Sequence, residues 1–284
     1  MTERRISRGL VLSGGGVAGG AWMVGLIDGV RKLGVDLGLA DLIVGTSAGA
    51  RTGAQLATGA LERSAEMYRR AETPSLIAPV GLDVFVTASM RIVASEPDPQ
   101  EAARRIANLA PLGAGLVPDA ERRKFVAAQV PSRAWPARPR FKVTAVDAGS
   151  GERAVFDAGS GADLHDALAA SGALPGIFPL VAIAGRRYAD GGVYSLYNAD
   201  VAAGCDVVVV LTPTPLNPYL KSKLDAEIAA LGQATVGVLV ADQDSLKAIG
   251  PNPLSADAAV AAVVAGAEQG KREIDRLRAL WRGA

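Results

Sequence analysis

The sequence predicts an α/β protein in which a mainly parallel central sheet is covered by helices on both faces. The first observation is that short apolar runs alternate with helical patterns in the N-terminal part of the chain. Strands are expected at 9–13 and 42–44, followed by helices at 21–33 and 50–58. The second is the run Asp206–Leu211 (DVVVVL), whose β-branched residues are typical of a core strand. Strands that alternate with helices form parallel sheets covered on both faces.

The remaining elements follow the same patterns. Helices are expected at 61–70, 100–109, 119–129, 163–171 and 255–280, a hairpin at 140–147 and 153–157, and strands at 186–189 and 237–240. Pro74, Pro79, Pro97, Pro99 and Pro111 cut residues 73–118 into short pieces, which we interpret as a helical insertion or lid. No linker divides the chain. We therefore expect a single domain over 1–284, with its core at about 8–213 and a C-terminal helical segment at 219–284.

Composition excludes several classes of function. The 284 residues carry a net charge of +1 and only 5% aromatic side chains, so neither a basic surface nor base stacking indicates nucleic-acid binding. Cys205 is the single cysteine and His165 the single histidine. An internal disulfide is thereby excluded, and no cysteine and histidine cluster exists for zinc, so we expect no metal site.

The N-terminus has the outline of a signal peptide or a membrane span. Arg4, Arg5 and Arg8 precede the uncharged run Gly9–Ile27. That run is interrupted by Gly14, Gly15, Gly16, Gly19 and Gly20. Each glycine costs about 1 kcal/mol in a helix interior, and no other run is long enough to cross a bilayer. We therefore expect a cytoplasmic protein, and any membrane contact is expected to be peripheral.

Residues 45–49 (GTSAG) have the G-x-S-x-G form between a predicted strand and a predicted helix. This pattern is typical of a tight strand-to-helix turn that projects the serine hydroxyl. Gly45 and Gly49 would allow strand and helix to pack closely where a side chain would collide. Short matches of small residues are common, so a turn without chemistry is the alternative. The flanking elements favour Ser47 as a nucleophile.

The glycine loop 14–19 (GGGVAG) permits three interpretations. Gly14, Gly16 and Gly19 satisfy the G-x-G-x-x-G pattern of dinucleotide binding, and the acidic residue Asp36 follows downstream. Alternatively the loop is an oxyanion hole whose donors are the amides of Gly14, Gly15, Gly16 and Val17. A purely structural turn is the third. Both functional interpretations use exposed amides at a helix N-terminus, so the loop alone does not choose between them.

A third motif, Asp190-Gly191-Gly192, follows an apolar strand. A carboxylate in that position suits a base held against a nucleophile, although an ordinary turn has the same sequence. A Ser-His-Asp triad would need His165. That histidine lies between Asp163 and Asp166 on what the periodicity indicates is the exposed face of a short helix. We therefore favour a dyad of Ser47 and Asp190 without a histidine.

These motifs together resemble the patatin-like phospholipases. That family carries a G-G-G-x-R/K-G loop, a G-x-S-x-G serine and a D-G-G/A aspartate in this order. The segment 170–179 (ASGALPGIFP) is similar to the family's A-S-x-A-x-P-x-x-F-P segment, and Asn198-Ala199-Asp200 to its continuation. The resemblance spans about residues 8–213. It implies a three-layer α/β/α fold, hydrolysis of lipid acyl esters by a Ser47–Asp190 dyad through an acyl-enzyme, and no cofactor.

Ala18 departs from the family, which usually has Arg or Lys at this loop position. The departure puts head-group preference and rate in question but leaves the backbone donors in place. Two alternatives to the hydrolase therefore remain, a dinucleotide-binding enzyme that uses the glycine loop and a weakly active binding protein of the same fold. The expected partner is a lipid or ester substrate. The motifs leave acyl-chain length and head group open, so phospholipid, lysophospholipid, neutral lipid and simple ester all fit.

Overall fold

The computed structural model describes residues 5–72, 82–112 and 116–282. Within these residues eight strands form one sheet, in the order β5-β6-β3-β2-β1-β7-β8, with β4 paired to β3. They are β1 (Arg8–Leu12), β2 (Leu42–Thr46), β3 (Arg140–Asp147), β4 (Arg153–Phe156), β5 (Val181–Ile183), β6 (Arg186–Asp190), β7 (Val207–Thr212) and β8 (Thr235–Val240). The neighbours from β3 to β8 run parallel, whereas β4, β5 and β6 pair antiparallel. The predicted mainly parallel sheet is confirmed.

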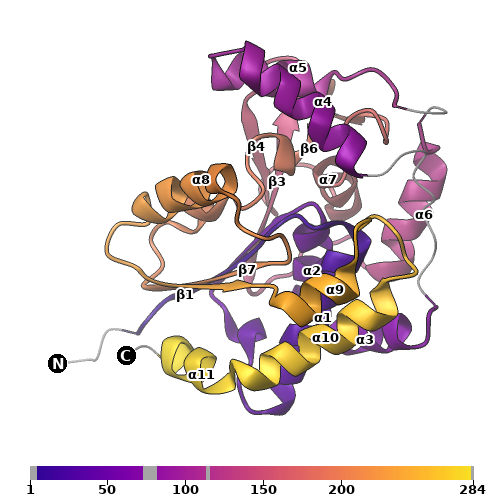
Figure 1. Ribbon diagram of the computed structural model, residues 1–284. Coiled ribbons are helices and arrows are strands. Elements are labelled where there is room, and N and C mark those ends of the chain that lie inside the picture. Colours follow the sequence, from indigo (N-terminus) through magenta and orange to yellow (C-terminus); the bar gives the residue numbers. More distant parts are fainter. Residues whose placement is uncertain (1–4, 73–81, 113–115, 283–284) are drawn as a thin grey trace.

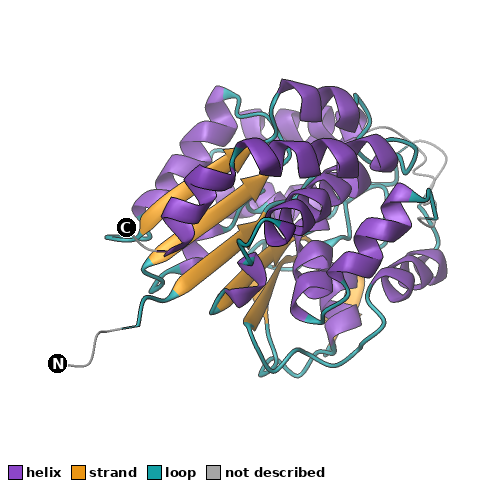
Figure 2. Cartoon of the chain, turned by 90° about the horizontal axis from the view of Figure 1, so that it is seen from below, coloured by secondary structure: helices purple, strands orange, loops and turns teal. Residues whose placement is uncertain are grey.

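Helices cover both faces of this sheet. They are α1 (Gly16–Lys32), α2 (Ala48–Ala57), α3 (Leu61–Arg69), α4 (Leu82–Ser95), α5 (Pro99–Ala107), α6 (Asp119–Gln129), α7 (Leu164–Ser171), α8 (Pro218–Ala229), α9 (Gln243–Ile249), α10 (Ala259–Arg272) and α11 (Ile274–Arg282), with short 3-10 turns η1 (Leu37–Leu39), η2 (Gly191–Val193) and η3 (Ala199–Ala202). Figure 1 shows α8 on one side of β1 and β7 and α1, α9 and α10 on the other. Figure 2, seen from below, shows strands with helices around them.

The side chains of the central strands divide between two apolar clusters. On β1, Leu10 and Leu12 enter a cluster that includes α1, α2 and α10, whereas Val11 enters a second cluster with Leu224 of α8. This division follows from the alternation of side chains across a pleated strand. Because both faces are covered, the central strands β1, β2 and β7 are buried along almost their whole length, and the fold has three layers, α/β/α.

Helix α1 begins at Gly16, five residues before the predicted start at position 21, and it continues through Gly19 and Gly20. The physical reason is its crossing with α10. A Cβ on Gly25 would lie 1.9 Å from the carbonyl oxygen of Val263, and a Cβ on Gly266 would lie 2.1 Å from that of Trp22. The two backbones therefore touch directly. The close packing at this crossing offsets the free-energy cost of placing glycine in a helix interior.

The C-terminal part differs from the single helix predicted at 255–280. It forms α10 and α11, which are separated at Glu273. Helix α10 packs on α1, while α11 turns onto β7 and β8 and buries Leu277 and Trp281. The indole of Trp281 donates to the carbonyl of Asp36 (3.0 Å). Segment 219–284 also contains β8, which was predicted, and helices α8 and α9, which agree with a helical segment but were not predicted individually.

The elements predicted for the middle of the chain are largely confirmed. The hairpin is β3 and β4, and α6 has the predicted bounds. Residues 82–95 and 99–107 are helical, as α4 and α5, which agrees with a helical insertion; Pro74 and Pro79 lie outside the described residues. Across the described ranges, no helix has the length and apolar character needed to cross a bilayer.

Candidate active site

Ser47 lies at a sharp turn between β2 and α2. Its backbone has φ 54° and ψ −116°, a strained conformation for a residue with a side chain. Two glycines make the turn possible by close approach. A Cβ on Gly45 would lie 2.5 Å from the Cα of Ala50, and a Cβ on Gly49 would lie 2.0 Å from the carbonyl oxygen of Leu12. The predicted strand-to-helix turn is confirmed, with the serine hydroxyl projected from the carboxyl end of β2.

Asp190 is the last residue of β6, on the other side of β3 from Ser47. In the sheet Thr46 pairs with Thr144, and Asp190 pairs with Ala145. The two side chains therefore project at the same level from either side of β3. Gly191 allows the chain to turn there, because a Cβ would lie 2.5 Å from the carbonyl oxygen of Thr144.

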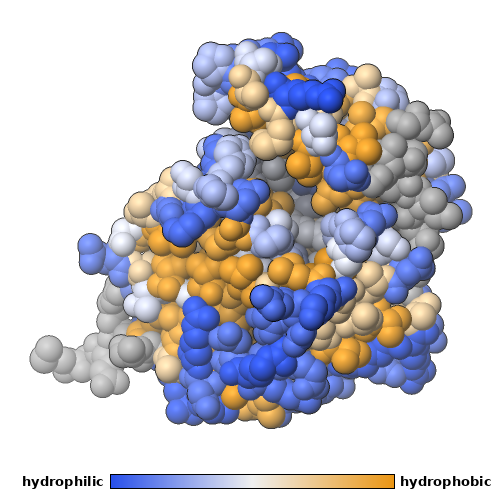
Figure 3. Space-filling view, in the orientation of Figure 1, coloured by the Kyte–Doolittle hydropathy of each residue, from blue (hydrophilic) through white to orange (hydrophobic). Residues whose placement is uncertain are grey.

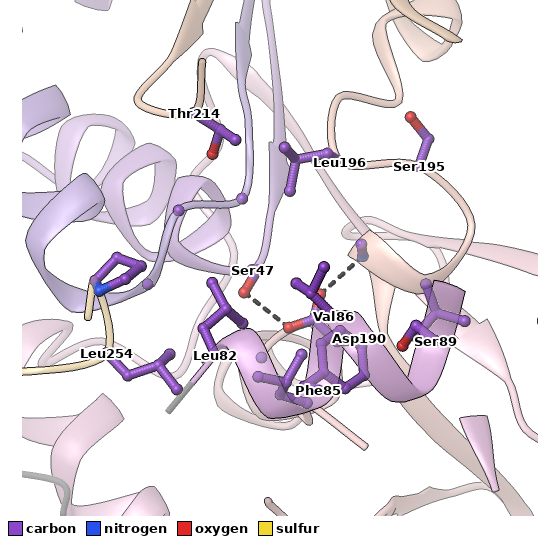
Figure 4. Close-up of a pocket in the computed structure, with 18 of the residues that line it drawn as sticks. Ser47, Leu82, Phe85, Val86, Ser89, Asp190, Ser195, Leu196, Thr214 and Leu254 are labelled. Carbon is purple, nitrogen blue, oxygen red and sulfur yellow. Dashed lines mark hydrogen bonds between the residues drawn. The ribbon is translucent and has the colours of Figure 1, made fainter. Parts of the chain in front are cut away.

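The two side chains meet in a hydrogen bond. The Ser47 hydroxyl donates to Oδ2 of Asp190 at 2.8 Å, and the Gly192 amide donates to Oδ1 at 2.7 Å. Figure 4 shows both bonds as dashed lines, with Ser47 and Asp190 pointing toward one another. The backbone N–H of Ser47 donates to Oγ of Ser171 at 2.8 Å, which anchors the turn to the end of α7. One oxygen of the carboxyl is thus fixed by the backbone and the other faces the hydroxyl.

Burial makes Asp190 a stronger base than an ordinary aspartate. Its side chain is buried, and loss of hydration raises the pKa of Asp190 to about 6. The hydrogen bonds from Gly192 and Ser47 and the charges of Arg51 and Arg122 oppose this rise. A base with a pKa near 6 is ionised at pH 7 and accepts a proton more readily than one at about 3.9.

The glycine loop lies against Ser47 at the start of α1. A Cβ on Gly14 would lie 3.6 Å from the Cβ of Ser47. The amide of Gly14 donates to the carbonyl of Leu196 (3.0 Å), so it is not available as a donor, contrary to the prediction. The amides of Gly15, Gly16 and Val17 find no acceptor among the described residues. Free N–H groups at a helix N-terminus attract negative charge, so these three remain candidate oxyanion donors.

Gly19, which was predicted as a motif glycine, packs closely against Pro213. Pro213, which follows β7, covers the loop from the side, and a Cβ on Gly15 or Gly19 would lie 2.2 or 2.7 Å from its Cγ. Both glycines are therefore needed for the loop to pass beneath this proline.

Asn198 ties the two halves of the site together, a role that the sequence did not reveal. Its side-chain amide is buried and donates to Oγ1 of Thr46 (3.0 Å), to Oγ1 of Thr144 (3.2 Å) and to the carbonyl of Ser195 (2.6 Å). It thus joins β2, β3 and the segment that follows Asp190. The residue was noted only as part of a motif, and its left-handed backbone (φ 54°) cannot be read from the sequence.

A cavity of about 310 Å³ opens over Ser47 and Asp190. Its apolar lining comes from several elements and includes Leu82, Phe85, Val86 and Val93 of α4, Phe125 and Val126 of α6, and Leu168, Leu174 and Phe178. Figure 4 shows Leu82, Phe85 and Val86 close to Ser47 and Asp190. In Figure 3 apolar side chains are exposed on α4, above the hollow. Leu174 and Phe178 of the ASGALPGIFP segment belong to this lining, whereas Ile177 of the same segment is not among the described lining residues.

His165 is buried, so the prediction of an exposed face was wrong. Only 7% of the residue is accessible, and its Nε2 donates to the carbonyl of Val130 (2.7 Å). Val130 caps the C-terminus of α6, which packs over α7 and covers the ring. The flanking Asp163 and Asp166 do reach the surface, where they pair with Arg133 and Arg123. The histidine borders a separate hollow and is not among the residues that line the cavity of Ser47.

Asp36 is placed where it cannot serve a dinucleotide at the glycine loop. It caps η1, its carboxylate accepting from the amide of Gly38 (2.8 Å), and it precedes β2. In dinucleotide-binding folds the ribose lies at the carboxyl ends of the parallel strands. Asp36 lies at the amino ends of the parallel strands, whereas the glycine loop lies at their carboxyl ends. The two parts of the predicted dinucleotide site are therefore not brought together. Among the described residues no group of three or more His, Cys, Asp or Glu side chains could hold a metal ion.

The patatin-like phospholipase family model matches residues 10–203, which contain the glycine loop, the turn at Ser47 and Asp190. The chain belongs to the patatin-like phospholipase family. Family membership places it among lipid hydrolases in general, and the three-layer fold agrees with that assignment.

Two solved structures are similar to this patatin-like chain. VipD from Legionella pneumophila has 15% identity and a TM-score of 0.49, with 96% of this chain and 67% of that chain covered. The type III effector protein ExoU has 16% identity and a TM-score of 0.42, with 96% and 53% covered. This chain thus spans about half the length of the ExoU chain. No curated protein sequence matches it significantly.

The patatin-like loop of this chain carries no cation. Ala18, where the family usually has Arg or Lys, is fully buried in the core on α1. The described cations that line the cavity are instead Arg51, Arg122 and Lys223, from α2, α6 and α8. Sequence reasoning did not single out any of them. Arg51 stands one helical turn after Ser47, but that spacing alone does not tell which way the side chain points.

Proposed function

We propose that this protein is a serine esterase that hydrolyses lipid acyl esters with a Ser47–Asp190 dyad. The observation that carries the proposal is the 2.8 Å hydrogen bond from the serine hydroxyl to a buried carboxyl whose pKa is raised to about 6. A nucleophile and its base must lie within hydrogen-bond reach, and the base must be free to take a proton near neutral pH. Both conditions are met without a histidine.

The reaction would proceed through an acyl-enzyme. Oγ of Ser47 attacks the acyl carbonyl carbon while its proton passes to Asp190. The carbonyl oxygen becomes an oxyanion and accepts hydrogen bonds from the amides of Gly15, Gly16 and Val17. Collapse of this intermediate breaks the ester bond, and Asp190 gives its proton to the departing alcohol. Water then attacks the acyl-enzyme with Asp190 again as the base, which releases the acid and restores Ser47.

The substrate is inferred from the lining of the cavity. Its apolar walls from α4, α6 and α7 suit an acyl chain more than a polar group, since burying apolar surface favours binding. Three apolar side chains on α4 also face solvent: Val84, Val86 and Met90 are 40%, 47% and 40% exposed. Exposed apolar groups at the mouth of a site are typical of an interaction surface. They support a peripheral contact with a lipid surface, from which an ester would enter the cavity.

A fluorophosphonate probe tests the nucleophile directly, because it reacts only with an activated serine. The wild-type protein should be labelled, and Ser47→Ala should not. Ser171→Ala is the matched control, since it removes the hydroxyl at the end of α7 that accepts from the Ser47 amide but leaves Oγ of Ser47 in place. Labelling that persists in Ser47→Ala would refute the assignment. Absence of both labelling and turnover in the wild type would favour a binding protein of the same fold.

A further inference from the structure

Arg51 places a guanidinium in the cavity wall without a counter-ion. It lies on α2, one turn after Ser47, with its guanidinium over the ring of Phe125 at 5.0 Å from the centroid. Its Nε and Nη2 are shielded from solvent and make no hydrogen bond of normal geometry, although the Tyr68 hydroxyl lies nearby. Among the described residues no carboxylate lies within 4.0 Å of it. Removing a charge from water without giving it a partner costs free energy, so binding of an anion at this position would be favourable.

Arg122 of α6 adds a second buried guanidinium to the same wall. It is 3% exposed, donates from Nη1 to the carbonyl of Ala169 (3.0 Å), pairs through Nη2 with Asp119, and has no partner at Nε. Arg122 and Phe125 are three residues apart on α6, and side chains at that spacing are neighbours. Because Arg51 stacks on Phe125, the two guanidinium groups border the same part of the cavity.

The charges that line the cavity do not cancel. The described lining residues include three cations, Arg51, Arg122 and Lys223, and one carboxyl group, Asp190. Asp190 is held by Ser47 and Gly192, and neither arginine reaches it as an ion pair within 4.0 Å. The outer partner of Arg122, Asp119, is shared with Arg123. Positive charge therefore remains in excess beside the ester site, even when Asp190 is ionised.

We propose that Arg51, supported by Arg122, binds an anionic group carried by the lipid ester itself, a phosphate or a carboxylate, so that the enzyme prefers an acidic lipid over a neutral one. This inference rests on the proposed esterase function. The arginines would act as specificity residues: the acyl chain occupies the apolar walls, and the acidic group replaces the missing counter-ion. Hydrogen bonds to charged groups contribute about 1.5–3 kcal/mol, enough for roughly a tenfold to hundredfold preference.

A matched pair of lipids tests this preference. Monoacylglycerol and lysophosphatidic acid with the same acyl chain differ only in the phosphate. For Arg51→Gln we expect the ratio of kcat/KM on lysophosphatidic acid to kcat/KM on monoacylglycerol to fall about tenfold or more, mainly through KM for lysophosphatidic acid. Arg51→Lys keeps the charge and should retain most of the preference. Arg91→Gln is the control, because it removes an exposed cation of α4.

Binding is measured separately in a Ser47→Ala background, where Arg51→Gln should weaken lysophosphatidic acid but not monoacylglycerol. Added inorganic phosphate distinguishes a lipid-borne group from the free ion: strong inhibition of monoacylglycerol cleavage by millimolar phosphate would favour a free-anion site and overturn the proposal. Equal losses on both lipids, or none, would also overturn it and leave the esterase function standing. Failure of the wild type to cleave either lipid, without probe labelling, would instead refute the esterase function.

Discussion

Ser47 and Asp190 project from opposite sides of strand β3 and meet in a hydrogen bond of 2.8 Å. The register sets this contact, because Thr46 pairs with Thr144 while Asp190 pairs with the next residue, Ala145. One side chain leaves a parallel neighbour of β3 and the other an antiparallel neighbour. A strained turn at Ser47 and a glycine after Asp190 then bring the two groups together without any histidine.

The first prediction concerns the pH dependence of the reaction. Asp190 must be ionised to act as a base, so the acylation rate should rise with pH and level off above about 6, the raised pKa of its carboxyl. Asp190→Asn should lower the rate by two or more orders of magnitude, because an amide cannot take the proton. Single-turnover acylation between pH 4 and 9 measures both effects. A rising limb that survives in Asp190→Asn would place the base elsewhere.

The same substitution has a predicted effect on stability. A carboxyl with a pKa raised in the folded state binds its proton more tightly there than in the unfolded chain. The wild type should therefore lose stability as pH rises from about 4 to 6, by about 2–3 kcal/mol from this group. Asp190→Asn should lack that loss and be the more stable protein at pH 8. Urea unfolding of the wild type and Asp190→Asn, at about pH 4 and at pH 8, measures this difference. Equal changes in stability with pH in the two proteins would contradict the raised pKa.

The second prediction tests the close crossing of α1 and α10. Helix propensity alone would make Gly25→Ala stabilising by about 1 kcal/mol. We expect instead a loss of about 2–3 kcal/mol, because the new Cβ would lie 1.9 Å from the carbonyl oxygen of Val263. Gly20→Ala on the same helix is the control: its Cβ would meet nothing closer than 3.5 Å and should be neutral or mildly stabilising. Urea unfolding of both variants gives the comparison.

The third prediction separates structure from catalysis at His165. His165→Ala removes the donor to the carbonyl of Val130, so we expect the free energy of unfolding to fall by about 1–3 kcal/mol. His165→Gln can keep a donor there and should lose less. Esterase activity per folded molecule should remain close to that of the wild type in both. Loss of activity to the level of Ser47→Ala in a folded His165→Ala protein would give the histidine a role in the reaction.

The fourth prediction concerns the exposed apolar side chains of α4. Val84→Asp places a charge on the exposed apolar surface of α4 and should reduce cosedimentation with lipid vesicles by about tenfold, because the charge opposes burial at an interface. Cleavage of a dissolved short-chain ester should be unchanged. Leu39→Asp is the control, since Leu39 is 69% exposed on η1, which precedes β2 at the amino ends of the strands, away from the cavity at their carboxyl ends. Equal loss of vesicle binding in both variants would argue against a docking role for α4.

Several features could be predicted because they depend on neighbours in the chain. The turn at Ser47 requires small flanking residues within a five-residue segment, and the start of α6 or the strand at 207–212 follows from local pattern. His165 was misjudged for the complementary reason: its polar neighbours do lie at the surface, but α6, from another part of the chain, covers the ring. Local periodicity does not report what packs on a helix.

By itself, then, the sequence determined the order of the motifs, the alternation of strands and helices, and the identity of Ser47 and Asp190 as candidates. The tertiary structure decided that these two side chains form a hydrogen bond and that the amide of Gly14 donates to the carbonyl of Leu196. It also decided that Arg51 lies in the cavity wall without a carboxylate partner among the described residues. The physical reason is that turn and strand formation depend on neighbouring residues. Desolvation and pairing depend instead on groups that the register of the sheet and the packing of α2, α6 and α10 bring together from distant parts of the chain.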